Sequence, residues 1–317
     1  MRILFVGNIC IDFGCVASIN NSLQKTEHEI FALYYPTYQP RYEYYNSILE
    51  AQIEAFKPDL IICEKVMGLT YEMIMDLKKR FNVPIVQWTF DHMGTVLGED
   101  RWKWWGKQAK AFDLVFNSEN CMHDKYLKEG INHRIIRQGF NQEVFKKVEL
   151  TKGDKIKYAS DVMFVGQAYN KWRQKFIENL TKDKDINFKW YSQTYLEKLN
   201  KAGNCSKIAI ATNIVDTEDR GWSNKLAEYM GMGLLVLSPH LQTMDKVGFK
   251  DKENIVYYKT HDLDDLKAKI KYYLEHEKER KKIAENGRKL ALETMTWDIQ
   301  VNKLLKQIEK EGIVKSH

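Results

Sequence analysis

Cysteine is scarce in this sequence, and its placement excludes a scaffold held together by cross-links. The five cysteines contain no Cys-x-x-Cys pair, and an odd, scattered set is typical of reduced thiols rather than of a disulfide framework. The eight histidines are also scattered singly, so we predict no metal site. Small disulfide-rich and zinc-stapled proteins are therefore excluded.

Long apolar runs are missing as well. No stretch approaches the roughly 20 apolar residues that span a bilayer, and the first apolar run is too short for a signal-peptide core, so we expect a cytoplasmic protein. Only 5 prolines and 17 glycines occur among 317 residues, with 44% hydrophobic and 29% charged residues, which is typical of a folded globular chain. At roughly 150 residues per domain, this length suggests two domains.

Short apolar runs alternate with amphipathic segments along most of the chain, as in proteins built from parallel strands and crossover helices. The first half contains expected strands at residues 3–6, 30–34, 60–63, 85–88, 114–116 and 134–136. A polar stretch after Phe145 interrupts the pattern and is interpreted as a linker. Further strands are expected at residues 161–165, 186–190, 207–211, 234–237 and 255–258, and helices at 262–276, 277–293 and 297–311.

These elements predict an α/β protein with two doubly wound Rossmann-like domains. The first spans residues 1–150, the second spans 151–295, and a final helix at 296–317 is expected to pack back toward the first domain. Two such domains would face each other across a cleft, because ligands bind at the carboxyl ends of parallel strands.

Charge is divided unevenly between the two halves. Residues 1–150 hold 18 Lys and Arg against 19 Asp and Glu, net −1, whereas residues 151–317 hold 31 against 24, net +7. A basic second half suits an anionic ligand. Evenly mixed lysine-rich helices are the simpler explanation of the same excess.

Residues 223–233 are the most informative segment for function. Ser223 or Asn224 is expected to cap a helix whose free N–H groups and dipole attract an anion. Lys225 adds a positive charge in the first turn, and Glu228 follows one turn later, where its carboxylate can accept hydrogen bonds from a ribose diol. The alternative is an ordinary amphipathic helix with Lys225 and Glu228 as a surface pair.

Residues 161–173 form a second candidate segment, in which an expected strand ends in glycine and a helix follows. Gly166 permits close approach of the backbone to a ligand, Gln167 lies in the short polar loop, and Arg173 can reach a diphosphate. A glycine in an ordinary strand-to-helix turn is the alternative here.

Together these segments resemble the GT-B glycosyltransferases of the spore-maturation (CgeB-like) type, which are related to the group 1 glycosyltransferases. The similar motifs in the second half are 164–166 followed by Arg173, 223–233, 248–258, 280–287 and 296–297. The first half is similar more loosely, through residues 57–60, 83–88 with Asp91, 113–118, and 139–141 with Phe145.

The resemblance implies a hexosyl- or pentosyltransferase that moves a sugar from a nucleotide-sugar donor, a UDP-sugar by expectation, to a hydroxyl acceptor. The second domain would hold the donor, with Glu228 on its ribose and with Arg173 and Lys225 near its diphosphate. Group 1 relatives carry another glutamate eight positions before the first, where this chain has Arg220, and this arginine is expected on the diphosphate instead. The resemblance implies no metal or other cofactor.

A general base is expected in the first domain if the enzyme inverts the configuration of the sugar. Asp91 is preferred, because Asp91 and His92 follow an expected strand closely, and Asp12 follows the first strand. Loop capping explains these residues equally well. Asp262 and Asp264 form an Asp-x-Asp pattern, which we interpret as carboxylates favoured at a helix start rather than as metal ligands.

Aromatic and basic residues gather between positions 101 and 110, in a segment expected to form a loop on the acceptor side. Its acceptor-side candidates are Trp102, Lys103, Trp104 and Trp105, and Arg101, Lys107 and Lys110 add further basic charge. Aromatic faces stack on sugars and bases alike, or pack down into a core. The acceptor therefore stays open between a glycan, a small molecule and a hydroxymethylated base in DNA, as in phage DNA glycosyltransferases. A non-catalytic GT-B-like binding protein and a nucleotide-sugar epimerase are the remaining alternatives.

Overall fold

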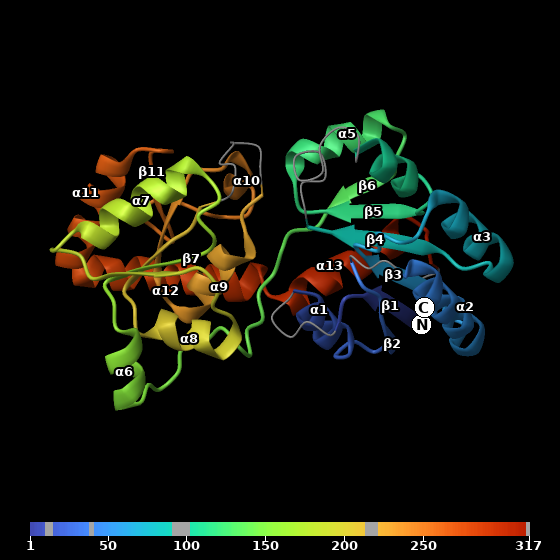
Figure 1. Ribbon diagram of the computed structural model, residues 1–317, viewed down its shortest axis with the longest axis horizontal. Coiled ribbons are helices and arrows are strands. Elements are labelled where there is room, and N and C mark those ends of the chain that lie inside the picture. The colour runs from blue at the N-terminus through green and yellow to red at the C-terminus, as the bar shows by residue number, and fades with distance from the viewer. Residues whose placement is uncertain (10–14, 38–40, 91–101, 213–220, 315–317) are drawn as a thin grey trace. The chain divides into compact units, whose positions relative to one another are not determined.

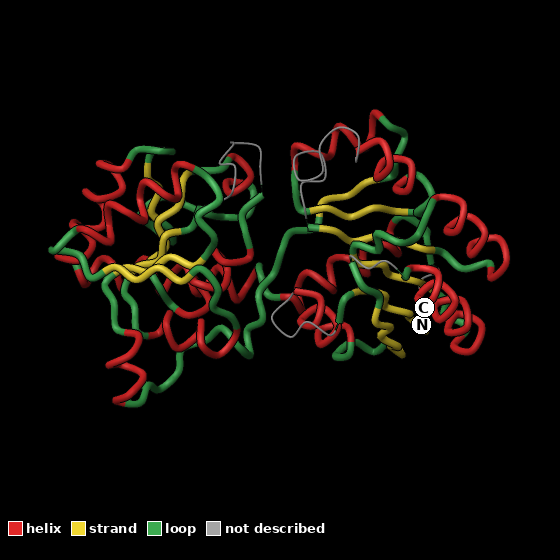
Figure 2. Tube along the Cα trace, in the orientation of Figure 1, coloured by secondary structure: helices red, strands yellow, loops and turns green. Residues whose placement is uncertain are grey.

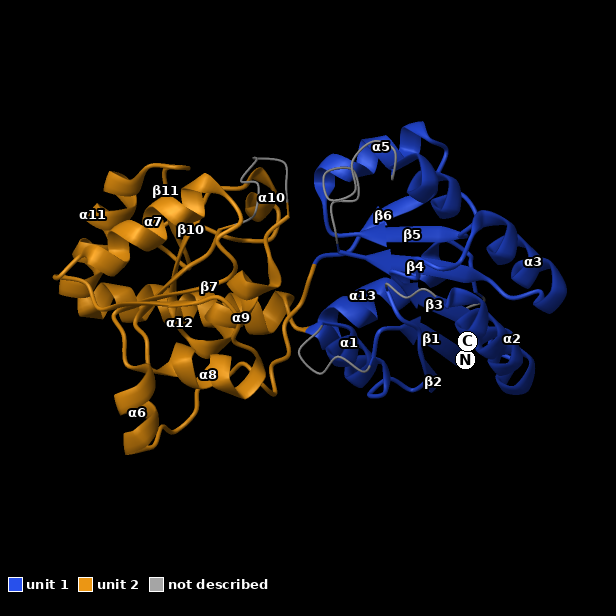
Figure 3. Ribbon diagram, in the orientation of Figure 1, with its two compact units in different colours: residues 1–137, 297–317 blue, residues 138–296 orange. Residues whose placement is uncertain are grey.

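The computed structural model describes residues 1–9, 15–37, 41–90, 102–212 and 221–314 (Figure 1). By its internal contacts the chain divides into two compact units (Figure 3). Unit 1 consists of Met1–Arg137 and Trp297–His317, and unit 2 consists of Gln138–Thr296. In both units, strands alternate with helices along the chain (Figure 2).

Unit 1 is built on a six-stranded parallel sheet with strand order β2-β1-β3-β4-β5-β6. The strands are β1 (Arg2–Gly7), β2 (Glu29–Tyr34), β3 (Leu60–Glu64), β4 (Ile85–Thr89), β5 (Leu114–Asn117) and β6 (His133–Ile135). All neighbouring strands pair in parallel, for example Ile3 with both Ile30 and Leu60. The six strands expected from apolar runs are confirmed, with small differences at their ends.

Helices cover both faces of this sheet. They are α1 (Cys15–Leu23), α2 (Tyr42–Phe56), α3 (Tyr71–Phe81), the 3-10 turn η1 (Asn120–Met122), α5 (His123–Lys128) and α13 (Trp297–Lys310). Residues 102–109 are helical too. The helices α2 and α3 end at Lys57 and Asn82, which adopt left-handed backbone angles, and a proline follows each of them closely.

The C-terminal helix α13 belongs to unit 1. It packs beside α1 (Figure 1), and Val301, Leu304 and Ile308 are fully buried in the same cluster as Ile3 and Phe5 of β1. Burying a large apolar side chain contributes roughly 1.5–3 kcal/mol. This helix is therefore part of the core of unit 1.

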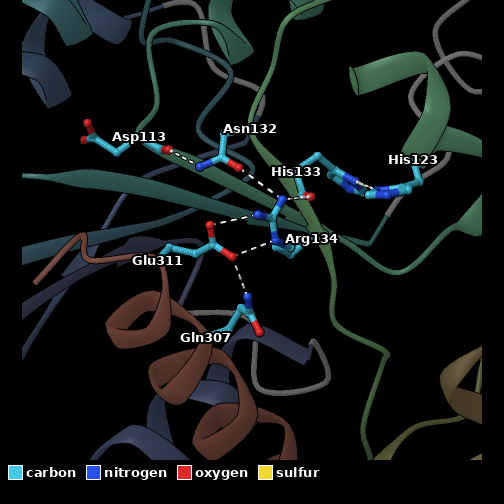
Figure 4. Close-up of polar contacts among 7 residues, drawn as sticks. All are labelled: Asp113, His123, Asn132, His133, Arg134, Gln307 and Glu311. Carbon is cyan, nitrogen blue, oxygen red and sulfur yellow. Dashed lines mark hydrogen bonds and ion pairs between the residues drawn. The ribbon is translucent and has the colours of Figure 1, made fainter. Parts of the chain in front are cut away.

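A partly exposed ion pair links the residue that follows α13 to β6. The guanidinium of Arg134 donates to both carboxylate oxygens of Glu311, at 2.7 and 2.8 Å, and Gln307 donates to the same carboxylate (Figure 4). Bidentate pairs of this kind fix orientation as well as distance.

Unit 2 has a five-stranded parallel sheet with strand order β11-β10-β9-β7-β8. Its strands are β7 (Val162–Val165), β8 (Phe188–Tyr191), β9 (Ile208–Ile210), β10 (Leu235–Pro239) and β11 (Val256–Tyr258). Its helices are α6 (Lys152–Tyr158), α7 (Lys171–Lys182), α8 (Leu196–Asn204), α9 (Asn224–Met232), α10 (Gln242–Asp245), α11 (Leu263–Glu275) and α12 (Glu277–Thr294). The expected strands of the second half and its three C-terminal helices are confirmed.

The structure differs from the sequence reading between residues 138 and 158. Unit 2 begins at Gln138 rather than after residue 150, because Phe140 and Phe145 are buried in its core. The polar stretch interpreted as a linker contains α6, whose first turn has a capping box in which Thr151 and Asp154 bond reciprocally. Polar composition hid this short helix, since α6 buries little more than Tyr158.

Among the described residues, no helix is both long enough and apolar enough to cross a membrane.

Candidate functional site

The carboxyl end of β7 carries the first group of candidate residues. Gly166 follows the strand with φ 153°, and a Cβ there would meet the Phe164 ring at 3.1 Å and the Arg173 guanidinium at 3.5 Å. Its N–H donates to the carbonyl of Tyr191 on β8 at 3.0 Å. Only a residue without a side chain fits this turn easily, so the glycine at this position has a structural cause.

Arg173 lies in the first turn of α7 and is almost completely buried. Its guanidinium donates to the carbonyl oxygen of Gln167 at 3.1 Å and to that of Thr212, just after β9, at 2.7 Å. The Asn170 side chain caps α7 by accepting from the backbone N–H of Arg173 at 2.8 Å. Arg173 therefore holds two loops at the carboxyl edge of the sheet, and its positive charge lies where those loops meet.

The helix α9 begins at the same edge of the sheet. Ser223 stands at its N-cap position, but in the part of the chain that the structure describes its hydroxyl makes no capping hydrogen bond. Instead the side-chain oxygen of Gln138 accepts from the backbone N–H of Asn224 at 2.9 Å. Ser223 therefore occupies the expected N-cap position without a side-chain cap, and a residue distant in sequence bonds the first N–H of the helix.

Glu228 is held in a defined orientation one turn further along α9. Its two carboxylate oxygens accept from the Asn224 side-chain amide at 2.9 Å and from the Lys225 ammonium at 2.8 Å. The Glu228 side chain is only 6% exposed, whereas that of Lys225 is 24% exposed. This is a buried, oriented acceptor rather than the surface pair of the simpler alternative.

A hydrogen bond joins the α9 and β7 segments. The Tyr229 hydroxyl accepts from the backbone N–H of Val165 at 3.0 Å, next to Gly166. Burial raises the pKa of the Tyr229 hydroxyl above its ordinary value, which keeps it protonated at neutral pH. The two segments that the sequence singled out therefore meet at one edge of the unit 2 sheet.

A small open pocket lies at this edge, between the carboxyl ends of β9 and β10 and the start of α9. Its cavity volume is only about 10 Å³, and it is lined by Ala211, Thr212, Trp222, Ser223, Leu226, Ser238, Pro239 and Leu241. Pockets for complete small molecules usually enclose about 300–1,000 Å³. This cavity is far smaller, with room for about one water molecule.

The N-termini of α7 and α9 differ electrostatically from those of the other described helices of unit 2. Neither has an acidic residue in its first turn, whereas α6, α8, α10, α11 and α12 all do. Lys171, Arg173 and Lys225 supply positive charge instead. Since a helix N-terminus already carries a partial positive charge, these two ends favour an anion.

Asp262 behaves as the sequence indicated. Its side chain caps α11 by accepting from the backbone N–H of Asp265 at 3.0 Å. Within the described ranges, no cluster of three or more His, Cys, Asp and Glu side chains has an arrangement that would hold a metal ion.

Four candidate residues lie outside the described residues, so their proposed roles rest on the sequence alone. They are Asp12, Asp91, His92 and Arg220.

The tryptophan segment is helical rather than a loop, and two of its three indoles belong to the core of unit 1. Trp105 is fully buried and donates its indole N–H to Tyr126 at 3.0 Å, and Trp102 is also buried, with the Lys125 ammonium 4.1 Å from its ring centroid. Trp104 and Lys103 are exposed. The prediction of a loop was wrong, because Trp102 and Trp105 lie about one helical turn apart and pack inward together.

Ion pairs offset part of the basic character near this helix. Lys107 pairs with Glu72, and Lys110 pairs with Glu129 at 3.1 Å. A duplex nucleic acid binds through phosphate contacts to basic side chains. The described part of this segment therefore adds no support to the nucleic-acid alternative.

The sequence model of the glycosyl transferase-like family matches residues 144–306, just over half of the chain. The chain belongs to this family, within the group 1 glycosyltransferases. No curated protein sequence matches it significantly.

Solved structures identify the fold as GT-B. The chain is similar over 98% of both lengths to sucrose-phosphate synthase from Thermosynechococcus elongatus, with TM-score 0.70 and 12% identity. For Anabaena Alr3699/HepE in complex with UDP and glucose the TM-score is 0.68 at 12% identity, covering 98% of this chain and 100% of that one. For UDP-GlcNAc 2-epimerase from Neisseria meningitidis bound to UDP-GlcNAc it is 0.60 at 13% identity, covering 98% and 100%.

Proposed function

We propose that this protein is a glycosyltransferase that binds a nucleotide-sugar donor, a UDP-sugar, at the carboxyl edge of the unit 2 sheet. The observation that carries the proposal is the buried carboxylate of Glu228, which Asn224 and Lys225 orient at the start of a helix that favours anions. Alr3699/HepE, which has a similar fold, was solved with UDP-glucose. Within the group 1 glycosyltransferases, we further propose that the chain is of the CgeB-like type.

Glu228 would accept hydrogen bonds from the ribose diol of the donor, because an ionised carboxylate has lone pairs beyond the two that Asn224 and Lys225 use. The start of α7, the start of α9 and the partly exposed Lys225 would surround the diphosphate.

In the proposed reaction, an acceptor hydroxyl oxygen attacks the anomeric carbon of the donor sugar. The bond between that carbon and the diphosphate oxygen breaks, and the hydroxyl proton passes to a base. Positive charge and backbone N–H groups around the diphosphate stabilise the negative charge that develops on it. Asp91 is the proposed base, with His92 and Asp12 as alternatives from the sequence.

Substitution of Glu228 tests the donor site. We expect Glu228→Gln, which keeps the side-chain size, and Glu228→Ala to weaken UDP-sugar binding roughly 10- to 100-fold, because charge-assisted hydrogen bonds are worth about 1.5–3 kcal/mol. Binding is measured by thermal shift and calorimetry with UDP, GDP and TDP sugars. Glu178→Ala, exposed on α7, is the matched control.

The assignment is wrong if none of these nucleotides stabilises the wild-type chain, or if Glu228→Gln binds them as the wild type does. If a nucleotide does bind, turnover assays distinguish a transferase from an epimerase. Transfer of the sugar or hydrolysis of the donor supports a transferase. Isomerisation of the donor sugar without an acceptor would indicate an epimerase instead, and binding without any turnover would indicate a non-catalytic protein.

A further inference from the structure

Gln138 has an unusual position at the start of α9. A serine at an N-cap position normally accepts a hydrogen bond from the first turn of its helix. Within the described part of the chain Ser223 makes no such bond, and the backbone N–H of Asn224, the first residue of the helix, donates to the side-chain oxygen of Gln138 at 2.9 Å, although 86 residues separate the two in sequence. The Gln138 amide oxygen therefore already accepts a hydrogen bond from the end of α9 that, in the proposed function, faces the diphosphate.

A phosphate oxygen and the Gln138 amide oxygen would compete for this N–H group. A backbone N–H at a helix start is a better partner for an anion than for a neutral amide, because the helix dipole adds to the attraction. The first turn of α9 carries Lys225 and no acidic residue, which favours the anion further. We therefore expect a bound diphosphate to displace the Gln138 amide oxygen from the N–H of Asn224.

Gln138 is also the first residue of unit 2, and Arg137, the residue before it, still belongs to unit 1. On the unit 1 side, the Arg137 guanidinium donates to the carbonyl of Ser118 and to the side chain of Asn120. On the unit 2 side, Phe140 is buried and its N–H donates to the carbonyl of Met295 at 2.9 Å. Between these two anchors, the Gln138 side chain is a further attachment of the connecting segment to α9.

We propose that Gln138 is a donor-sensing residue: its amide oxygen holds the N–H of Asn224 until the diphosphate of the nucleotide displaces it, which releases the first of the two segments that connect the units. The inference rests on the proposed donor site and adds to it a residue that reports whether the phosphate position is filled. Its chemistry is competition between two acceptors for one N–H group, and no covalent step is involved.

Three variants and two ligands test this inference in the full-length chain. Gln138→Ala removes the competing oxygen, so we expect a lower melting temperature but roughly fivefold tighter binding of UDP, about the effect of one hydrogen bond. Gln138→Glu puts a carboxylate where the helix dipole stabilises it and where it repels phosphate, so we expect an unchanged or higher melting temperature and weaker binding of UDP. Gln242→Ala, exposed on α10, is the control.

Uridine provides the second arm, because it has the base and ribose of UDP without phosphates. Its affinity should be the same in wild type, Gln138→Ala and Gln138→Glu. Hydrogen exchange around residue 138 should also increase when UDP is added to the wild type, and uridine should not cause this increase.

Other outcomes overturn the inference. If Gln138→Ala weakens UDP and uridine equally, the side chain only holds α9 in place, and if UDP affinity is unchanged in both variants, there is no competition. In either case the donor site itself stands, since the wild type binds UDP. If the wild type binds neither UDP nor uridine, the proposed function fails and this inference fails with it.

Discussion

His123 and His133 form a close pair in unit 1. Their Nδ1 atoms are 2.7 Å apart (Figure 4), and the His133 ring stacks on Tyr126 with centroids 4.4 Å apart. At this distance one nitrogen donates and the other accepts, so the contact requires at least one neutral ring. Burial, followed by the charges of His123 and Arg134, lowers the pKa of His133 to about 3.

This residue should make the stability of unit 1 depend on pH. In the unfolded chain His133 takes up a proton near its ordinary pKa of 6.5, but in the folded chain only near 3, so stability is full above pH 6.5 and is lost as the pH falls toward 3. The slope is at most about 1.4 kcal/mol per pH unit. Urea unfolding at pH 7 and pH 4.5 measures it, and His133→Gln should lose less stability than wild type.

His240→Gln, exposed in unit 2, is the matched control for this comparison. Equal losses in wild type and His133→Gln would show that the histidine pair contributes nothing to the pH dependence.

At the scale of elements, α9 has different requirements at its two ends. Its N-terminus belongs to the candidate site, whereas its C-terminus needs glycine twice. Gly233 ends the helix in a left-handed conformation with φ 83°, and Gly231 packs directly on the Phe140 ring and the Phe145 carbonyl group. The helix is therefore fixed against the segment that follows Gln138.

Gly231→Ala should destabilise unit 2 by about 1–3 kcal/mol, the usual range for overpacking a core. A Cβ at this position would lie 2.8 Å from the Phe145 carbonyl oxygen and would also overlap the Phe140 ring, so one of the two must move. The free energy of unfolding by urea is the measurement. Gly153→Ala is the contrasting variant, since its Cβ has room, and helix propensity predicts a gain of up to about 1 kcal/mol. Equal effects of the two substitutions would contradict the packing argument.

At the scale of the whole molecule, unit 1 is assembled from both ends of the chain. Residues 1–137 supply the sheet, and α13 supplies one side of the core beneath it, where Trp297 meets Trp88 with ring centroids 5.8 Å apart. Unit 2 is continuous in sequence and contains the described residues of the proposed donor site.

Deleting residues 297–317 should therefore destabilise unit 1 without removing the donor site of unit 2. Leu304→Ala is the milder version, with an expected cost of about 2–5 kcal/mol because Leu304 is fully buried. Limited proteolysis mapped by mass spectrometry should show new cleavage in residues 1–137 only, while UDP binding persists. Lys306→Ala, exposed on the same helix, is the control. Cleavage spread evenly over both units would contradict the division.

Much of the fold could be predicted from local sequence. The apolar runs ending at Val165 and Leu237 and the turns at Lys57 and Asn82 are each determined by residues close to one another in the chain, so their periodicity and prolines predicted them. The short, polar α6 was missed because capping, rather than an apolar face, defines it.

The amino-acid sequence alone was enough to predict two parallel α/β units, to propose Gly166, Arg173 and Glu228 as donor-site candidates, and to show the excess positive charge of the second half. The folded structure was needed to show that Gln138 bonds the first N–H of α9, that Trp102 and Trp105 belong to a core, and that Glu228 is buried and oriented. The reason is physical: hydrophobic periodicity and turn preferences act between neighbours in sequence. A hydrogen bond or a packing contact between distant residues exists only once the chain has folded.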